Sequence, residues 1–347
     1  MITASPVAAQ YPPAEKLSPT RGTAQRWQQL WREAIIDPHE LLRLLQLEHL
    51  AAELLPATDT GFAMRVPRGF AARMRAGDPL DPLLLQVLAR AQELADVPGF
   101  VRDAVGDAAA RSAQGVLQKY VGRALLIATG SCAVNCRYCF RRHFPYAQQT
   151  AATNGWREAI AQVRADDSID EVILSGGDPL SLSTAKLAEL SDVLADVPHL
   201  RRLRIHTRLP VVLPERVDEE LTHWLLRLPW PVVIVVHSNH ANELDGSVAQ
   251  ACARLRATGA QLLNQSVLLK QINDRAETLI ALSERLLDCG VLPYYLHQLD
   301  PVAGTAHFAV SDAAARALVE TMRSRLSGYL VPKLVREVAG EPHKQPL

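Results

Sequence analysis

The sequence predicts an α/β fold: an open, partial (β/α)6 barrel that follows a helical N-terminal region. Short apolar runs recur from Arg123 onward, and amphipathic stretches separate them. One run with its following stretch takes roughly 30 residues, the size of a βαβ unit. Because six such units are two short of a closed eight-stranded barrel, we expect the sheet to remain open.

The N-terminal region carries apolar residues spaced three and four apart, which predicts helices interrupted by prolines. The stretches with this spacing are WQQLWREAI, PHELLRLLQL and DPLLLQVLARAQEL. We therefore expect a helical region over residues 1–118, the barrel over residues 119–330, and a C-terminal tail over residues 331–347.

Strands and helices alternate through the barrel. The predicted strands are ALLIATG, EVILSGG, RLRIHT, PVVIVVHSN, QLLNQSVLL and VLPYYLHQLD. The predicted helices are NGWREAIAQVRA, TAKLAELSDVLADV, PERVDEELTHWLLRL, NELDGSVAQACARLRATG and AETLIALSERLLDCG. This alternation predicts a parallel sheet covered by helices. Polar residues such as Ser175, His206, His237 and Gln298 gather where strands end, which is the edge where such folds bind ligands.

Composition narrows the class of partner. Lys and Arg total 37, as do Asp and Glu, so we expect a small-molecule substrate and neither a nucleic acid nor a membrane partner. The first residues lack the pattern of a signal peptide, and no apolar run reaches the roughly 18 residues of a membrane span. Five cysteines, with Cys252 and Cys289 isolated, do not suggest disulfides. These features predict a cytoplasmic protein.

Three cysteines lie within eight residues in CAVNCRYC, at Cys132, Cys136 and Cys139. Their spacing would also suit small apolar residues on one face of a buried helix. The stretch is polar and basic, follows a strand and is closed by Pro145, so we expect a loop instead. Two metal sites fit: a zinc ion with His143 as fourth ligand, or a four-iron cluster that leaves one iron open.

With SGGDP after the next strand, this cysteine loop resembles the radical S-adenosylmethionine (SAM) superfamily, whose fold is a partial, TIM-like barrel. The resemblance implies a [4Fe-4S] cluster on the three cysteines. It also implies that Gly176, Gly177 and Asp178 contact the methionine amino group of S-adenosyl-L-methionine.

The stretch from Tyr120 to Pro346 is similar to the lysine 2,3-aminomutase family. The matching motifs are KYVGRALLIATGSC, CRYCFRRHF, ILSGGDPL, RIHTRLPVVLPERV, HSNHANEL, LLNQSVLLKQIND, PYYLHQLDPVAGTAHF and SGYLVPKLV. The resemblance implies an isomerase that converts L-α-lysine to (R)-β-lysine. It is nearest to the short branch whose product a separate ligase attaches to elongation factor P. It further implies an electron donor for the cluster, and homo-oligomers are possible.

In that family a lysine near the C-terminus binds pyridoxal 5'-phosphate, and Lys344 occupies the matching position. Tyr120 and Arg123 match residues near the pyridoxal phosphate. His237 and Gln265 match polar residues of the S-adenosylmethionine site. These roles are what the resemblance implies.

The resemblance also implies how substrate is held. Arg141 matches the arginine that binds the substrate carboxylate, and Asp300 matches a carboxylate that binds the distal ammonium. Glu337 stands where lysine enzymes of the family have an aspartate. Two other functions stay open: an arginine or glutamate 2,3-aminomutase of the same fold, and a non-catalytic zinc-binding module.

Overall fold

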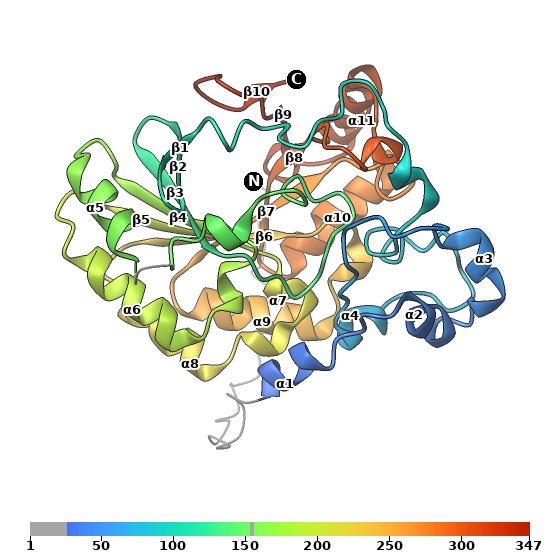
Figure 1. The fold of residues 1–347 in the computed structure, drawn as a ribbon, viewed down its shortest axis with the longest axis horizontal. Coiled ribbons are helices and arrows are strands. Elements are labelled where there is room, and N and C mark those ends of the chain that lie inside the picture. Colours follow the sequence, from blue (N-terminus) through green and yellow to red (C-terminus); the bar gives the residue numbers. More distant parts are fainter. Residues whose placement is uncertain (1–25, 153–155) are drawn as a thin grey trace, which may run out of the picture.

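The computed structural model describes residues 26–152 and 156–347. Its central element is one curved sheet (Figure 1). Its strands are β1 (Arg111–Ala113), β2 (Val116–Tyr120), β3 (Arg123–Thr129), β4 (Glu171–Gly176), β5 (Arg202–Thr207), β6 (Val232–His237), β7 (Gln261–Val267), β8 (Leu292–His297), β9 (Lys333–Arg336) and β10 (Gln345–Pro346). Neighbours in space are neighbours in sequence, and within the described residues β1 and β10 do not pair with each other. The sheet is therefore open, as predicted.

Strands β3 to β9 run parallel, with Arg123 opposite Glu171 and Leu203 opposite Val232. The six predicted strands are β3 to β8, which confirms the parallel α/β fold. Strands β1, β2 and β10 are antiparallel additions at the two edges. Because β3 to β9 point the same way, their carboxyl ends share one edge of the sheet.

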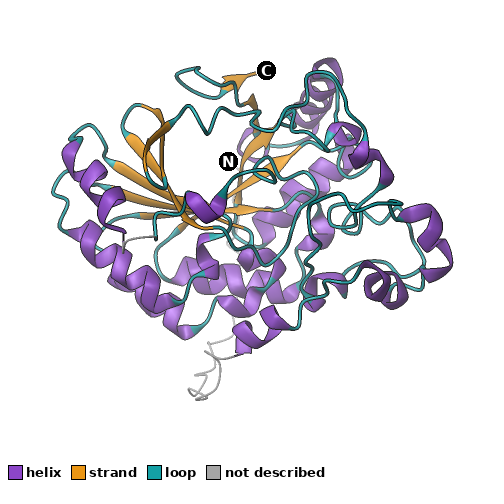
Figure 2. Ribbon diagram, in the orientation of Figure 1, coloured by secondary structure: helices purple, strands orange, loops and turns teal. Residues whose placement is uncertain are grey.

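Helices lie along the outer side of the curved sheet (Figure 2). They are α5 (Arg157–Ala165), α6 (Thr184–Ala195), α7 (Leu209–Val212), α8 (Glu219–Arg227), α9 (Gly246–Ala257), α10 (Ala276–Asp288) and α11 (Asp312–Arg325). The five predicted helices contain α5, α6, α8, α9 and α10 in this order. Ser183, Asp218, Asp245 and Ser311 begin α6, α8, α9 and α11 by accepting a backbone N–H. The first predicted helix began at Asn154, outside the described residues.

Apolar residues of strands and helices share one core. Val172, Leu203 and Ile234, on adjacent strands, are at most 1% exposed. Trp224 of α8 is buried in the same core, and its Nε1 donates to Ser191 Oγ of α6 at 3.0 Å. No helix in the described ranges is both long and apolar enough to span a membrane.

The N-terminal region contains α1 (Arg26–Arg32), α2 (Pro38–Leu44), α3 (Ala51–Leu54) and α4 (Arg68–Ala71), and its residues 1–25 lie outside the described part. The helix predicted for DPLLLQVLARAQEL is wrong: the chain forms turns there and then a 3-10 turn at Ala91–Leu94. Asp81 Oδ1 accepts the N–H groups of Leu83 and Leu84, and the Gln86 carbonyl bonds Arg137. The apolar spacing reflects burial, since Leu83 and Leu84 are both 0% exposed.

Other elements were not predicted. Residues 111–120 form β1 and β2 where a helical region was expected, and β9, β10 and α11 had no predicted counterpart. Each of these strands is short, so its sequence shows little periodicity. The C-terminal tail is thereby joined to the sheet: Gln345 pairs with Arg336, and β9 lies beside β8.

Candidate active site

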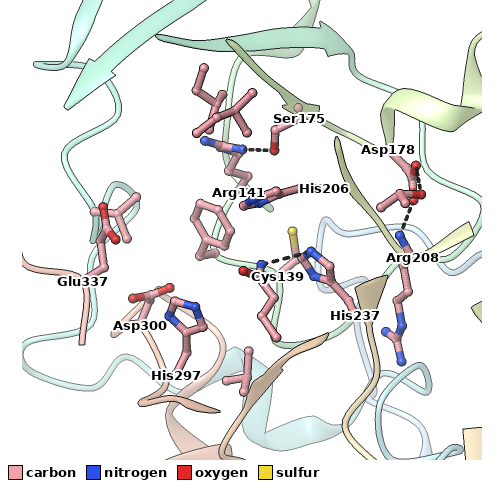
Figure 3. Close-up of a pocket in the computed structure, with 18 of the residues that line it drawn as sticks. Cys139, Arg141, Ser175, Asp178, His206, Arg208, His237, His297, Asp300 and Glu337 are labelled. Carbon is pink, nitrogen blue, oxygen red and sulfur yellow. Dashed lines mark hydrogen bonds between the residues drawn. The ribbon is translucent and has the colours of Figure 1, made fainter. Parts of the chain in front are cut away.

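A cavity of about 350 Å³ lies at the carboxyl ends of the parallel strands (Figure 3). Every residue to which the family resemblance gave a role lines it, whereas His143, the fourth ligand of the zinc alternative, does not. The residues with such a role are Tyr120, Arg123, Cys132, Cys136, Cys139, Arg141, Gly176, Gly177, Asp178, His237, Gln265, Asp300, Glu337 and Lys344. This size and position are typical of small-molecule sites in parallel α/β folds.

The three cysteines lie on a loop after β3, as predicted. Arg137, between Cys136 and Cys139, is fully buried and forms an ion pair with Glu93, which Arg142 also contacts at 2.8 Å. The Arg137 backbone N–H donates to the Gln86 carbonyl at 2.8 Å. The N-terminal region therefore fixes the shape of the cysteine loop.

The thiol environment bears on which metal fits. Burial, together with nearby Cys136, raises the pKa of Cys139 to about 11, so metal loading must displace protons. The described residues bring no three Cys, His, Asp or Glu side chains around a single ion. The His143 ring instead contacts the Ala303 carbonyl at 3.1 Å. This arrangement favours a cluster whose irons bind separate cysteines over one zinc ion.

The glycines after β4 permit two loops to touch. Gly176 has φ of +119°, and a Cβ on Gly177 would lie 2.4 Å from the Ser131 carbonyl oxygen. The Gly177 and Asp178 N–H groups donate to Thr129 and Ser131 carbonyls at 2.6 and 2.8 Å. Only glycine allows this approach, which joins the cysteine loop to the Gly-Gly-Asp loop.

The Asp178 carboxylate is occupied within the protein. Its Oδ1 accepts from Thr207 Oγ1 at 2.7 Å and from the Leu180 N–H, and its Oδ2 accepts from the N–H groups of Arg208 and Leu209. Two of these four bonds order the start of the segment after β5, at Arg208 and Leu209. Gly176 and Gly177 line the cavity, and their backbone is partly committed: the Gly177 N–H donates to Thr129, and the Gly176 carbonyl accepts from the Tyr146 hydroxyl at 2.8 Å.

His237 ends β6, and Gln265 lies opposite it in the adjacent β7; the two side chains contact each other, with 3.0 Å between Gln265 Nε2 and His237 Nε2. Burial, with nearby Arg208, lowers the pKa of His237 to about 3. The imidazole is therefore neutral at physiological pH. Two further histidines at the cavity, half-buried His206 and buried His297, have buried Nε2 atoms without a hydrogen-bond partner in the described structure.

Arg141 is anchored on one side and open on the other. Its Nε pairs with Asp107 Oδ2 at 2.6 Å, and its Nη1 donates to Ser175 Oγ at 3.2 Å. Asp107 also pairs with Lys119 at 2.7 Å. A guanidinium held through Nε presents its terminal nitrogens as a fork suited to a carboxylate.

The acidic side of the cavity holds Asp300 and Glu337, with His297 nearby (Figure 3). Asp300 Oδ1 is buried and has no hydrogen-bond partner in the described structure. Burial, opposed by the charge of Lys344, raises the pKa of Asp300 to about 7. Glu337 pairs with Lys344 and lies 3.5 Å from Lys119.

Sequence reasoning missed several lining or supporting residues: Asp107, Lys119, His206, Arg208 and His297. The polar stretch His206 to Arg208 was visible at a strand end but received no role. Asp107 belongs to none of the motifs, and Lys119, although it begins KYVGRALLIATGSC, received no role because its partners Asp107 and Glu337 are recognised only in the folded chain.

Comparisons with known proteins agree with this site. Residues 121–200 match a family described as a 4Fe-4S single cluster domain. The L-lysine 2,3-aminomutase of Escherichia coli (strain K12) is 49% identical over 92% of this chain and 94% of its own length. The L-lysine 2,3-aminomutase of Haemophilus influenzae is 46% identical over 92% of this chain and 95% of its own length. The enzyme of Clostridium subterminale is 31% identical over 93% of this chain and 77% of its own.

A solved radical SAM methyltransferase from Sphaerobacter thermophilus covers 64% of this chain and 68% of its own, with 17% identity and a TM-score of 0.46. The open, mostly parallel sheet covered by helices defines the protein as an α/β partial barrel. Within that class, the chain belongs to the L-lysine 2,3-aminomutase family. This confirms the family that the motifs predicted.

The residues present fit the cofactors that the sequence implies. Three thiols from one loop line the cavity that Lys344 also lines. The backbone of Gly176 and Gly177, after β4, lines the same cavity beside them. The buried Oδ1 of Asp300, without a partner in the described structure, provides an acceptor that a bound ligand can satisfy.

Proposed function

We propose that this protein is a radical SAM, pyridoxal-phosphate-dependent L-lysine 2,3-aminomutase, which moves the α-amino group of L-lysine to carbon 3 and yields (R)-β-lysine. The observation that carries the proposal is Asp300. Its carboxylate, whose buried Oδ1 has no hydrogen-bond partner in the described structure, shares a cavity with Arg141 and Lys344, in a chain 49% identical to an enzyme named L-lysine 2,3-aminomutase.

Each cofactor has residues to hold it. Cys132, Cys136 and Cys139 would bind three irons of a [4Fe-4S] cluster, and the fourth iron would stay open. Gly176 and Gly177, with His237 and Gln265, would line the S-adenosyl-L-methionine site. Tyr120, Arg123 and Lys344 would hold pyridoxal 5'-phosphate, with Lys344 attached to it. When bound, these groups supply a carbon radical that removes hydrogen from carbon 3 and a carrier for the migrating nitrogen.

The protein's own residues orient the substrate. Arg141, fixed by Asp107, would bind the carboxylate, while Asp300 and Glu337 would bind the distal ammonium. Gripping both ends fixes carbon 3 at one place in the cavity. Lys344 already pairs with Glu337, so a primary ammonium on a flexible chain can reach this carboxylate.

The acidic side of the cavity also bears on which amino acid binds. Asp300 and Glu337 disfavour glutamate, because like charges would be brought together in a buried site. Arginine is the second candidate substrate, since a guanidinium also suits two carboxylates. A substrate panel separates the two.

The product's destination is part of the proposal. The chain is 49% and 46% identical to the Escherichia coli and Haemophilus relatives but 31% identical to the Clostridium one, which supports the branch that serves elongation factor P. A separate ligase would take up β-lysine, and a one-electron donor would reduce the cluster. All five cysteines are free thiols, which supports a location in the reducing cytoplasm.

The test is an anaerobic assay of the reconstituted protein with L-lysine, S-adenosylmethionine, pyridoxal phosphate and dithionite, with products separated by chiral chromatography and mass spectrometry. We expect (R)-β-lysine. Lys344→Ala should abolish it, whereas Lys333→Ala, at an exposed lysine of β9, should not. If the protein forms β-arginine from arginine but no β-lysine from lysine, arginine is the substrate and the proposed lysine is wrong. Stoichiometric zinc with no iron would overturn the proposal.

A further inference from the structure

Arg208, directly after β5, places a buried guanidinium against one of the cluster cysteines. Its Nη1 lies 2.6 Å from Cys136 Sγ. Its backbone N–H donates to Asp178 Oδ2 at 2.6 Å, which fixes where the side chain begins (Figure 3). The side chain is 7% exposed, and its terminal nitrogens have no role in the substrate grip described above.

The guanidinium is held from several sides. Its Nη2 donates to Gln86 Oε1 at 2.6 Å and to Glu243 Oε2 at 2.9 Å. The rings of Phe70 and Tyr138 lie 5.5 and 5.7 Å from its Cζ, within range of cation–π contact. Arginine keeps its proton at any physiological pH, so this is a permanent buried positive charge.

Glu243, which pairs with Arg208 through Oε2, also serves other donors. It is 0% exposed, and its Oε1 accepts from the backbone N–H of Asn239 at 2.8 Å and from Gln86 Nε2 at 3.1 Å. The carboxylate is therefore spread over several donors, while Arg208 Nη1 donates to the Tyr138 hydroxyl at 2.8 Å as well as to Cys136 Sγ. The atom of the cluster loop nearest to this cation is Cys136 Sγ.

We propose that Arg208 sets the reduction potential of the cluster, by donating a charged hydrogen bond to Cys136 Sγ. Cluster potentials depend on net charge and on hydrogen bonds to the sulfurs. Reduction adds one electron from an external donor and breaks no bond, so the reduced cluster is more negative by one charge. A fixed cation in contact with a ligand sulfur stabilises that state and makes reduction easier. The inference rests on the proposed cluster at Cys132, Cys136 and Cys139.

The experiment measures midpoint potential by EPR-monitored redox titration of reconstituted protein, after iron and sulfide are quantified. Arg208→Met should lower the reduction equilibrium constant at least tenfold, a shift of about 59 mV to more negative potential for one electron. Arg208→Lys keeps the charge and should recover most of the shift. Arg216→Met removes another fully buried arginine, one that bonds the Leu180 carbonyl and should leave the potential unchanged.

A second measurement needs no substitution that could impair folding. Protein labelled with 15N in the arginine guanidino groups should show a nitrogen coupled to the reduced cluster by pulsed EPR, and Arg208→Lys should remove that coupling. The role of Arg208 is overturned if the parental protein shows no labelled guanidino nitrogen coupled to the cluster. It is also overturned if Arg208→Met, with full iron and sulfide content, keeps the parental midpoint potential. A parental protein that binds no iron and sulfide overturns the cluster assignment itself.

Discussion

At the scale of single residues, Asp300 is the side chain whose state depends most on the ligand. Its pKa is about 7 because burial disfavours the charge and Lys344 only partly offsets it. A substrate ammonium would supply the missing partner and favour the charged form. Without substrate, a buried carboxylate with an unpartnered oxygen should destabilise the fold at high pH.

Activity should therefore follow the ionisation of Asp300. Since the charged form binds ammonium, kcat/KM for lysine should rise with pH through about 7 and then level. Asp300→Asn should lower kcat/KM roughly 10- to 100-fold, the loss of one charged hydrogen bond, and remove that rise. Steady-state kinetics from pH 6 to 9 check this. Asp192→Asn, an exposed position on α6, is the control and should keep the parental profile.

Stability should change in the opposite direction. The folded-state pKa is raised, so the folded protein holds this proton more tightly and its stability falls as pH rises from about 4 to 7. Asp300→Asn should therefore raise the free energy of unfolding at pH 8 by at most about 4 kcal/mol, at roughly 1.4 kcal/mol per pKa unit. Urea unfolding at pH 8 measures it. A variant less stable than the parent there would show that the carboxylate has a structural partner.

At the scale of elements, the loops after β3 and β4 work as one unit because Gly177 lets their backbones touch. Gly177→Ala would place a Cβ 2.4 Å from the Ser131 carbonyl oxygen, so the cysteine loop must shift. We expect bound iron to fall below half of the parental content. Gly246→Ala, where an added Cβ meets no atom within 4 Å, should retain full iron content. Equal iron in both variants would contradict the close packing.

The elements also show what sequence can and cannot predict. Strands β3 to β8 were predicted because each is an apolar run with polar residues at its end, and the cysteines because their spacing is a motif. The turns around Leu83 were missed because the apolar residues that this irregular segment buries happen to be spaced three and four apart, as in a helix. Asp107 and Lys119 were missed because their importance lies in pairing with Arg141 and Glu337, which only the folded chain brings near.

At the scale of the whole molecule, the N-terminal region is tied to the cysteine loop through Glu93. This carboxylate pairs with both Arg137 and Arg142, and all three are buried or nearly so. Removing it takes the Glu93 carboxylate from two buried cations, which keep only neutral hydrogen-bond partners in the described structure, such as the Phe62 and Gly304 carbonyls. The region should therefore contribute to cluster binding as well as covering the barrel.

Glu93→Ala should lower the free energy of unfolding by roughly 3–5 kcal/mol, as expected when a buried ion pair loses one member. It should also reduce iron retention, because Arg137 lies between two cluster cysteines. Urea unfolding and iron analysis measure the two effects. Glu48→Ala, an exposed acid of the same region, should change stability by less than about 0.5 kcal/mol.

The most direct test of the proposed reaction follows hydrogen. Lysine carrying deuterium at carbon 3 is turned over anaerobically, and the products are examined by mass spectrometry and NMR. We predict deuterium in the 5' position of the adenosyl group and at carbon 2 of β-lysine. Deuterium-free deoxyadenosine, or β-lysine with no label at carbon 2, would contradict radical aminomutation in this cavity.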